Sequence, residues 1–432
     1  MEARPSCSAR QKAKFGVGDH QRRGVHRLDA DALCKIFSLL DHNGLARCSA
    51  VCKSWHRIIQ ESSLWKDLCY KHYNKVKDGN SEGLSSCRGL PNMYFAELAM
   101  EQHRRSLTNG KFCVHQWDCH SNAINQCRMK MGMILTGVGD KVLRMWSSRS
   151  YRCIGEYSVP GVAELVDFDF DESKIVGLVG NQIYIWRRHG KQSILVSSKG
   201  QFSRGYCMRY MDPEAVIGCG DGTVRVYDMY SRACSQIIRM HAGPITCLSL
   251  SDHQFIISGS SLGSITVADL SSEQNVASLK TSTSPTGISS LCFNQGSYYV
   301  FAGSTSGFAH CWDLRTLKPF WETRASPNVL YSMHHLLNDT SSLAVGGIDG
   351  VLRIMDPNTG DVLSSYVPGG VINRSTFSSG LVQRNVRSLS QDSRIDVIPK
   401  KFRPPITSLA VGMEKVITAH NDKYIMMWKF HS

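Results

Sequence analysis

Seven similar segments recur along most of this chain, and each is a short strand-like stretch that follows a turn and ends on Trp, Tyr, Ala or Met. Their terminal positions are Trp146, Trp186, Tyr227, Ala268, Trp312, Met355 and Trp428, so successive steps are 40, 41, 41, 44, 43 and 73 residues. A period of about 40 to 45 residues is typical of one four-stranded blade of a β-propeller. The sequence therefore predicts a mainly β fold with seven blades and one long insertion before the last terminal position.

The last repeat has one strand too few. It ends at Phe430, and only His431 and Ser432 follow it. The segment from Phe112 to Trp117 alternates apolar and polar residues, precedes the first repeat and has no repeat of its own. Pairing it with the last blade would join the two ends of the ring and remove an exposed sheet edge. We therefore expect a propeller over residues 111–432 that is closed by its N-terminal strand.

The net charge of +14 comes mainly from two Arg- and Ser-containing segments. Residues 1–27 and residues 369–405 each hold seven Arg or Lys against two acids. Both segments show little hydrophobic periodicity, so we expect a disordered basic tail over 1–24 and a basic flexible insertion over 369–404. No aromatic stacking pattern accompanies the charge, and a nucleic-acid partner is therefore not expected.

Cysteine usage and hydropathy constrain the compartment. The sixteen cysteines show no Cys-x-x-Cys spacing and most sit singly in apolar strand patterns, which indicates free thiols in a reducing compartment. No window approaches a membrane span or a signal peptide. We expect a cytoplasmic and/or nuclear protein without a membrane partner. Cys113, His115, Cys119 and His120 crowd together, but no second paired motif completes a zinc site, so no metal and no cofactor are expected.

An acidic cluster lies near the end of one predicted strand. It consists of Asp167, Asp169, Asp171 and Glu172. We interpret these residues as solvated carboxylates in a turn, because acidic side chains are seldom buried without partners.

Residues 28–70 change from strand alternation to a helical period. Leu33, Ile36, Phe37 and Leu40 fall at i, i+3, i+4 and i+7, which places them on one helix face. Further apolar residues at steps of three and four over 45–59, and a serine cap at 62–63, predict two more helices. Three helices of about forty residues bury too little surface for secure independent stability, which implies a partner. Residues 73–110 form the expected linker, with a helical spacer at about 90–107.

The segment from Leu28 to Cys69 resembles an F-box. The matching residues are Leu28, Leu33, Ile36, Leu40, Leu45, Val51-Cys52-Lys53-Ser54-Trp55 and Leu64-Trp65-Lys66. Asp29 replaces the usual proline, although Asp also starts helices well. The resemblance implies a three-helix domain over 25–72 that docks onto the Skp-type adaptor of a cullin-based ubiquitin ligase. The expected adaptor contacts are Leu28, Leu33, Ile36, Leu40, Leu45, Val51 and Cys52, with Trp55 and Trp65 in the domain's own core.

The repeats resemble the WD-repeat family from about Lys111 onward. In that family a His, a Ser or Thr, an Asp and a Trp form a hydrogen-bonded structural tetrad within a blade. The first repeat matches all four positions with His120, Thr136, Asp140 and Trp146. The seventh matches three, with Thr418, Asp422 and Trp428.

Other repeats match the tetrad only in part. The fourth keeps His241 and Ser258 but has Leu262 and Ala268 at the other two positions, and the fifth has Trp312 without the Asp. We expect apolar packing to be the main stabilising force in these two blades. The spacing of the His, Thr and Asp residues is that of a structural tetrad and not of a catalytic triad. No enzyme activity is therefore expected.

The two resemblances together imply a non-catalytic, substrate-recognition subunit of an SCF-type ubiquitin ligase, with a cullin and an unknown protein substrate as further partners. Several WD-repeat members read phosphorylated peptides with arginines in turns of the propeller. The candidate residues here are Lys141, Lys423, Arg204 and Arg324, although lysine cannot make the forked contacts of arginine. Two alternatives remain open, namely a non-degradative scaffold and an RNA-associated protein that uses the basic segments.

Overall fold

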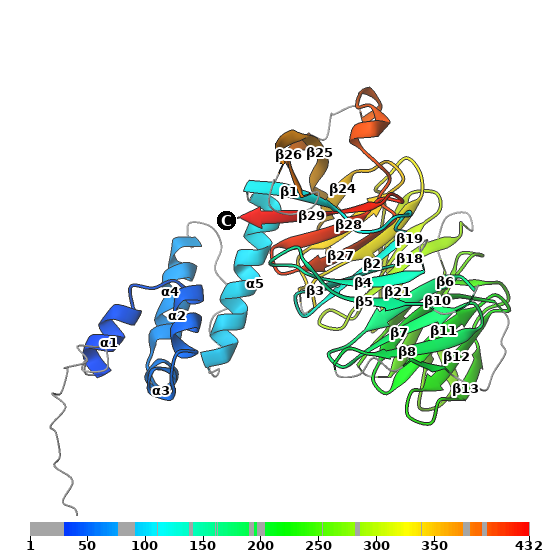
Figure 1. Cartoon of the computed structure of the whole chain (residues 1–432), viewed down its shortest axis with the longest axis horizontal. Coiled ribbons are helices and arrows are strands. Elements are labelled where there is room, and N and C mark those ends of the chain that lie inside the picture. Colours follow the sequence, from blue (N-terminus) through cyan, green and yellow to red (C-terminus); the bar gives the residue numbers. More distant parts are fainter. Residues whose placement is uncertain are drawn as a thin grey trace, which may run out of the picture. The chain divides into compact units, whose positions relative to one another are not determined.

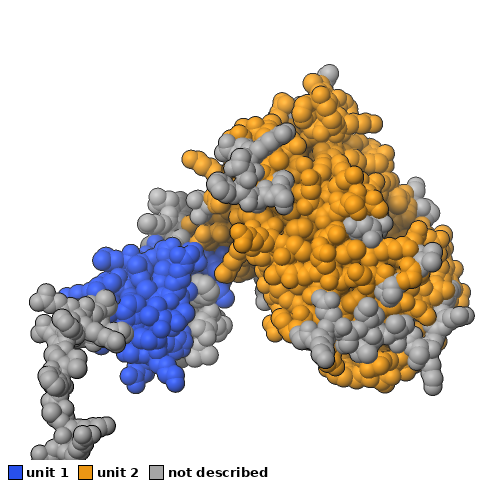
Figure 2. Space-filling model, in the orientation of Figure 1, with its two compact units in different colours: residues 1–99 blue, residues 100–432 orange. Residues whose placement is uncertain are grey.

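The computed structural model describes most of the chain in two compact units. The described residues are 30–76, 91–109, 111–137, 141–159, 161, 163–189, 194–196, 204–252, 254–280, 286–337, 339–374, 381–390 and 395–431. Unit 1 covers residues 1–99 and unit 2 covers residues 100–432, and the boundary falls inside helix α5 (Pro91–Asn109) (Figures 1 and 2). The prediction of a mainly β fold with N-terminal helices is confirmed.

Unit 1 is helical. Before α5 it contains α1 (Ala30–Phe37), α2 (His42–Ser49), α3 (Lys53–Glu61) and α4 (Leu64–Val76). Asp41 starts α2 by accepting a hydrogen bond from the N–H of Gly44 at 2.7 Å, and Cys52 starts α3 in the same way with the N–H of Trp55 at 3.5 Å. The stretch that we expected to form one helix over 45–59 is therefore divided into two, because Cys52 adopts an extended conformation.

Five blades of unit 2 are separate four-stranded antiparallel sheets. Their strands, in chain order, are β2 (Gln126–Lys130), β3 (Met133–Gly137), β4 (Val142–Ser147), β5 (Cys153–Ser158); β6 (Leu165–Phe170), β7 (Lys174–Val179), β8 (Gln182–Arg187), β9 (Ile194–Val196); β10 (Gly205–Met211), β11 (Glu214–Cys219), β12 (Thr223–Asp228), β13 (Ala233–Arg239); β14 (Ile245–Leu250), β15 (Phe255–Ser260), β16 (Ser264–Asp269), β17 (Gln274–Lys280); β18 (Ile288–Asn294), β19 (Tyr299–Ser304), β20 (Phe308–Asp313) and β21 (Lys318–Arg324).

The sixth and seventh blades lie in one nine-stranded sheet. Its spatial order is β22 (Leu330–His334), β23 (Leu343–Gly347), β24 (Leu352–Met355), β25 (Val362–Arg374), β26 (Val382–Leu389), β1 (Lys111–Asp118), β29 (Tyr424–His431), β28 (Lys415–Ala419) and β27 (Ser408–Gly412). Strands β22 to β25 form the sixth blade, and β27, β28, β29 and β1 form the seventh. Within the described residues the propeller thus has seven blades.

Strand β1 closes the ring. It pairs antiparallel with β29 along its whole length, from Lys111 opposite His431 to Asp118 opposite Tyr424. This is the pairing that the strand count of the last repeat led us to expect. The first strands of the blades, β2, β6, β10, β14, β18, β22 and β27, are neighbours around the centre, and β27 returns to β2. The two ends of the propeller are therefore joined through one blade.

The expectation of a flexible insertion over 369–404 is wrong for the part of it that the structure describes. Strand β25 continues to Arg374 and pairs with β26, which in turn pairs with β1, where Val114 faces Arg384. Leu389 at the end of β26 packs with Val351, and 3-10 turns follow at Ile395–Val397 and Lys400–Phe402. The physical reason is that apolar residues along β26 find buried neighbours in blades 6 and 7, which a reading of charge alone does not reveal.

A glycine in the turn between the second and third strands explains part of the repeat pattern. Gly222, Gly307 and Gly350 have φ angles of 80°, 90° and 72°. A Cβ atom at Gly222 would lie 2.1 Å from the carbonyl oxygen of His241, and the other two approach a carbonyl oxygen equally closely. Only glycine fits where the backbone is left-handed and a neighbouring chain passes this near.

Candidate functional site

The predicted adaptor contacts of unit 1 fall into two groups. Leu33 and Leu45 are 4% and 0% exposed, and they pack in the unit's own core with Phe37 and Trp65. Ile36 and Val51, by contrast, are 44% and 61% exposed. The expectation that Leu33 and Leu45 contact a partner is therefore corrected, because both side chains are already covered within the helical unit.

The remaining predicted residues of unit 1 have other roles. Leu40 and Cys52 are half-buried, and Cys52 caps α3. Leu28 lies outside the described residues. Sequence reasoning missed Leu39, which is 86% exposed and lies two residues beyond the end of α1. The signal was available, because Leu39 falls off the apolar stripe on which its neighbour Leu40 lies.

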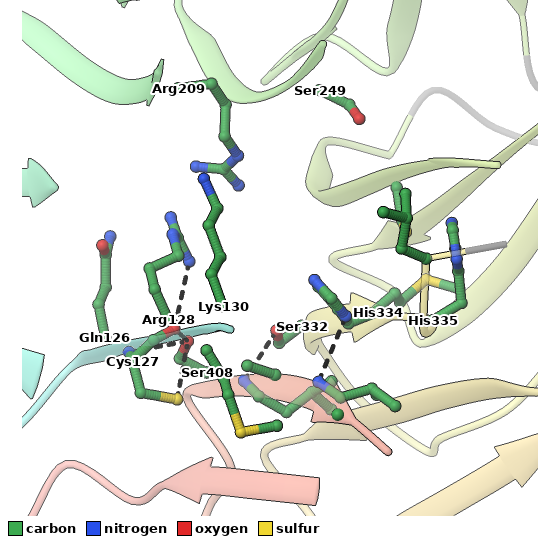
Figure 3. Close-up of a pocket in the computed structure, with 18 of the residues that line it drawn as sticks. Gln126, Cys127, Arg128, Lys130, Arg209, Ser249, Ser332, His334, His335 and Ser408 are labelled. Carbon is green, nitrogen blue, oxygen red and sulfur yellow. Dashed lines mark hydrogen bonds between the residues drawn. The ribbon is translucent and has the colours of Figure 1, made fainter. Parts of the chain in front are cut away.

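A cavity of about 940 Å³ occupies the centre of the propeller. Residues from the first strands of the seven blades line it, among them Arg128, Arg209, Ser249, Phe293, His334 and Ser408, together with Asp167. Figure 3 shows the side chains of Arg128 and Lys130 reaching from β2 toward the side chain of Arg209. Concave sites of this size, with a few polar groups among apolar ones, are the usual places for binding.

Asp167 is buried beside the cavity and is fully paired. Its carboxylate is 2.9 Å from the backbone nitrogen of Met208, which donates to it from β10. The guanidinium groups of Arg128 and Arg209 lie 3.0 and 3.3 Å from its oxygens. Asp167 therefore joins blades 1, 2 and 3, and it neutralises part of the positive charge that faces the cavity.

Asp169 repeats this arrangement two residues later. It is 3% exposed, accepts a hydrogen bond from the backbone N–H of Tyr210 at 3.1 Å, and lies 2.6 Å from the ammonium group of Lys130. Burial would raise the pKa of its carboxyl, but the charges of Lys130 and Arg128 outweigh burial and lower that pKa. The interpretation of Asp167 and Asp169 as solvated turn carboxylates is thus wrong, because partners from two other blades reach both.

Two adjacent histidines at the cavity differ in protonation. Both ring nitrogens of His335 face carbonyl oxygens, of Leu336 at 2.8 Å and of Phe293 at 3.0 Å, so the ring must carry two protons to donate to both. Burial opposes this charge, but Cys292 and the two carbonyl groups raise the pKa of His335 to about 9. His334 instead accepts from the N–H of Val411, and burial together with the charge of His335 lowers its pKa to about 3.

The predicted substrate residues lie away from this cavity. The ammonium group of Lys141 donates to the carbonyl oxygen of Gly161 at 3.2 Å, and Arg204 lies over the ring of Tyr206. Arg324 donates to the carbonyl oxygen of Pro327. None of Lys141, Arg204, Arg324 and Lys423 is among the residues that line the cavity. The four therefore remain a prediction that is separate from this cavity, and the cavity's own cations were missed because only the closed ring gathers them.

The tetrad of the first blade centres on a threonine hydroxyl. The indole N–H of Trp146 and the Nε2 atom of His120 both lie 2.9 Å from Oγ1 of Thr136. Arg144 donates to Nδ1 of His120 at 2.9 Å, and because a guanidinium can only donate, Nε2 of His120 carries the proton. Asp140, the fourth predicted member, lies outside the described residues. The set is a structural network inside one blade.

The seventh blade uses a histidine that sequence reasoning missed. The indole N–H of Trp428 donates to Thr418 at 3.0 Å, and Nε2 of His420 lies 2.7 Å from the same hydroxyl. The other ring nitrogen of His420 faces the carbonyl oxygen of Pro404 at 3.3 Å, so it carries the proton and Nε2 accepts from Thr418. Asp422 instead accepts from the N–H of Lys423. The sequence contained a signal for this contact: His420 follows Thr418 by two positions, and residues two apart lie on the same face of an extended chain.

Two family models match separate parts of the chain. One is described as F-box-like and matches residues 30–71, and the other is described as WD domain, G-beta repeat, and matches residues 273–313. The chain is also 47% identical over 431 residues to F-box/WD-40 repeat-containing protein At3g52030 of Arabidopsis thaliana, which covers 94% of this chain and 95% of that protein. The chain belongs to the F-box/WD-40 repeat family.

More distant relatives of this F-box/WD-40 repeat chain share only part of it. Cell division control protein 4 of Saccharomyces cerevisiae is 22% identical over 257 residues, which is 56% of this chain and 27% of that protein. Pre-mRNA-processing factor 19 of Oryza sativa subsp. japonica is 24% identical over 255 residues, or 55% of this chain and 47% of that protein. Among the described helices, none is long and apolar enough to cross a membrane.

Proposed function

We propose that this protein is the substrate-recognition subunit of an SCF-type ubiquitin ligase. In this proposal the F-box unit binds a Skp-type adaptor, a cullin joins through that adaptor, and the propeller holds a protein substrate for ubiquitination. The subunit itself is non-catalytic, because the conjugating chemistry belongs to other subunits. Membership of the F-box/WD-40 repeat family supports the proposal, and a location in the cytoplasm and/or the nucleus remains a prediction.

The observation that carries the proposal is the set of apolar side chains that unit 1 leaves exposed. Leu39, Val51 and Ile36 are 86%, 61% and 44% exposed, although the helical unit has a complete core of its own. Burying an exposed Leu, Ile or Val side chain contributes about 1.5 to 3 kcal/mol. These three side chains add little to the stability of the free chain. A partner that covers them is the simplest explanation for apolar residues at these exposed positions.

The test measures adaptor binding by the full chain. We expect L39E combined with V51E to reduce the affinity for a purified Skp-type adaptor by more than about a hundredfold, because two charges would be buried in an apolar interface. The matched control is I237E, which changes a side chain on strand β13 that is 55% exposed. It should bind the adaptor as the unchanged protein does.

Two outcomes would contradict the proposal. One is adaptor binding that survives the double substitution, and the other is an unchanged protein that binds no Skp-type adaptor. If the adaptor binds but no cullin joins the complex in cells, the non-degradative scaffold is favoured instead. Leu33 is unsuitable for this test because its substitution would disrupt the core of unit 1.

A further inference from the structure

One end of the central cavity is ringed by exposed apolar side chains. Met131, Met211, Met413 and Leu337 lie at or just beyond the ends of the first strands of blades 1, 3, 7 and 6, and all four line the cavity. They are 49%, 37%, 43% and 68% exposed. We call these four residues the apolar rim. A single exposed apolar residue is ordinary, but four from different blades around one cavity indicate a binding surface.

The chemistry of the apolar rim suits a flexible apolar ligand. Three of its four members are methionines, whose unbranched and polarisable side chains adapt to apolar groups of different shape. Met129 and Leu250 line the same cavity and extend this apolar character beyond the rim. A side chain of a partner protein could therefore enter between the blades and displace water from both surfaces.

Within unit 2, helix α5 holds the turn that carries one member of the apolar rim, Met413. Glu414, next to Met413, accepts a hydrogen bond from the side chain of Gln102 at 2.6 Å, and its backbone N–H donates to His103 at 3.0 Å. Ser106 also donates to the carboxylate of Glu414. A turn held by three residues of a helix is ordered before any ligand arrives, which reduces the entropic cost of binding.

The unpaired charge at this end of the cavity is positive. Arg149 and Lys415 line the cavity, and Lys429 stands opposite Lys415 in the pairing of β28 with β29. Burial and the charges of Lys429 and Arg149 lower the pKa of Lys415 against the opposing charge of Glu414. None of the three forms an ion pair with a carboxylate in the described part of the chain. We call Arg149, Lys415 and Lys429 the basic edge; it lies on blades 1 and 7.

Two acidic groups that line the cavity, Asp171 and Asp212, are already engaged. Asp212 lies 2.6 Å from the ammonium group of Lys174 and accepts hydrogen bonds from Tyr210 and Tyr230. The hydroxyl group of Tyr210 also donates to Asp171 at 2.9 Å. Asp167, which lines the cavity, and the buried Asp169 neutralise the cations of β2 and β10. Glu172 of blade 2 also lines the cavity and is exposed, so a ligand meets this one carboxylate and the larger group of cations on blades 1 and 7.

We propose that this end of the cavity binds a peptide segment of a partner protein that places an apolar side chain within the apolar rim and a carboxylate at the basic edge. The apolar group supplies most of the binding energy, since burial of one large side chain exceeds an exposed ion pair. The carboxylate fixes the direction in which the peptide crosses the rim. This inference rests on the proposed function only in taking the peptide to be part of a substrate.

The test begins by selecting peptides against the purified full chain. A displayed library of random peptides of about twelve residues, a length that spans a groove of this kind, is enriched on the protein. The strongest peptide is then made with a fluorescent label, and its affinity is measured by anisotropy. We expect peptides that combine a Leu, Ile, Met or Phe with at least one Asp or Glu.

Variants of the chain then locate the site. We expect the double variant M211E with M413E to reduce the affinity for the selected peptide by more than about thirtyfold. The double variant R149E with K415E should reduce that affinity by about tenfold at low salt. The matched controls are I237E and R187E, which change an exposed apolar and an exposed basic residue that do not line the cavity. Both controls should bind the peptide unchanged.

Several results would overturn the proposal. The proposal fails if the selection enriches no peptide, or if the enriched peptides lack the apolar or the acidic residue. It also fails if binding needs a phosphate in place of the carboxylate, or if the rim variants leave the affinity unchanged. Tighter binding of a peptide copied from residues 1–29 would assign the rim to the chain's own tail. A dimer that dissociates on M211E with M413E would assign it to a second copy. Adaptor binding by the same variants should be unchanged, so failure of the ligase proposal is seen separately.

Discussion

Blades 7 and 5 each have a buried tryptophan on the third strand, but the polar surroundings of the two indoles differ. Trp428 in blade 7 is 0% exposed and its N–H donates to Thr418. Trp312 in blade 5 is 2% exposed, and its indole nitrogen has no hydrogen-bond partner among the described residues, because Ala302 stands at the place of the threonine, ten residues before the tryptophan. Each blade nevertheless has four antiparallel strands: blade 5 is a separate sheet, and blade 7 is β27, β28, β29 and β1 within the nine-stranded sheet. Apolar burial therefore suffices to build a blade, and the hydroxyl network is an addition to it.

Acid should have the largest effect, and because burial also lowers the pKa of His310 in blade 5, the contribution of blade 7 is measured through His420 alone. Burial lowers the pKa of His420 in blade 7 to about 4, below its ordinary 6.5. The unfolded chain therefore binds this proton more tightly, and stability that is fully present above pH 6.5 is lost as the pH falls from 6.5 toward 4. The loss from this one group is about 3 kcal/mol. The free energies of unfolding of the unchanged protein and of H420Q are measured by urea titration at pH 7 and pH 4. The difference between the two proteins should be smaller at pH 4 by that amount.

The control for the acid experiment is H56Q, which changes an exposed histidine of α3. Its free energy of unfolding should stay parallel to that of the unchanged protein across the same pH range. If H420Q also stays parallel, His420 is not the group that makes blade 7 sensitive to acid, and this part of the comparison fails.

Removal of the bridging hydroxyl should have the next largest effect. T418V keeps the volume of the side chain but leaves the indole nitrogen of Trp428 and Nε2 of His420 without their shared partner. We expect a loss of about 2 kcal/mol in the free energy of unfolding, which is the usual cost of leaving a buried polar group unsatisfied. T316V, an exposed substitution in the turn after β20, should change it by less than about 0.5 kcal/mol. Equal losses for the two variants would show that the hydroxyl network contributes nothing specific.

The reverse substitution in blade 5 should have the smallest effect, and with the opposite sign. A302S adds a hydroxyl at the position that corresponds to Thr418, within reach of the unpaired indole nitrogen of Trp312. We expect a gain of about 1 kcal/mol, measured as a rise in the urea midpoint without a change in slope. The control is A302V, which adds bulk without a hydrogen bond. If it stabilises the protein as much as A302S does, filled volume and not the hydroxyl is the cause.

Periodicity along the chain predicted the larger part of the fold. The steps between Trp146, Trp186, Tyr227 and their successors gave the number of blades, and the missing last strand led to the pairing of β1 with β29. The helical period in residues 28–70 predicted unit 1. These patterns are visible in the sequence because alternation, turns and helix faces depend on residues only a few positions apart.

The candidate sites were predicted less well. Leu33 and Leu45 carry the same motif as Val51, yet they are buried in the core of unit 1 whereas Val51 is exposed. The basic residues chosen from turns do not line the cavity, whereas Arg128 and Arg209, which carry no motif, do. Burial and convergence depend on which elements meet in space, and a single sequence does not contain that information.

The sequence by itself determined that this chain forms a small helical unit followed by seven repeated sheets, because local patterning fixes the type and number of elements. Only the tertiary structure decided that β26 adds to β1 and that Asp167 and Asp169 pair with cations of neighbouring blades. It also decided which apolar side chains remain outside the cores. These outcomes depend on residues far apart in the chain, whose favourable burial and charge pairing arise only when the ring closes.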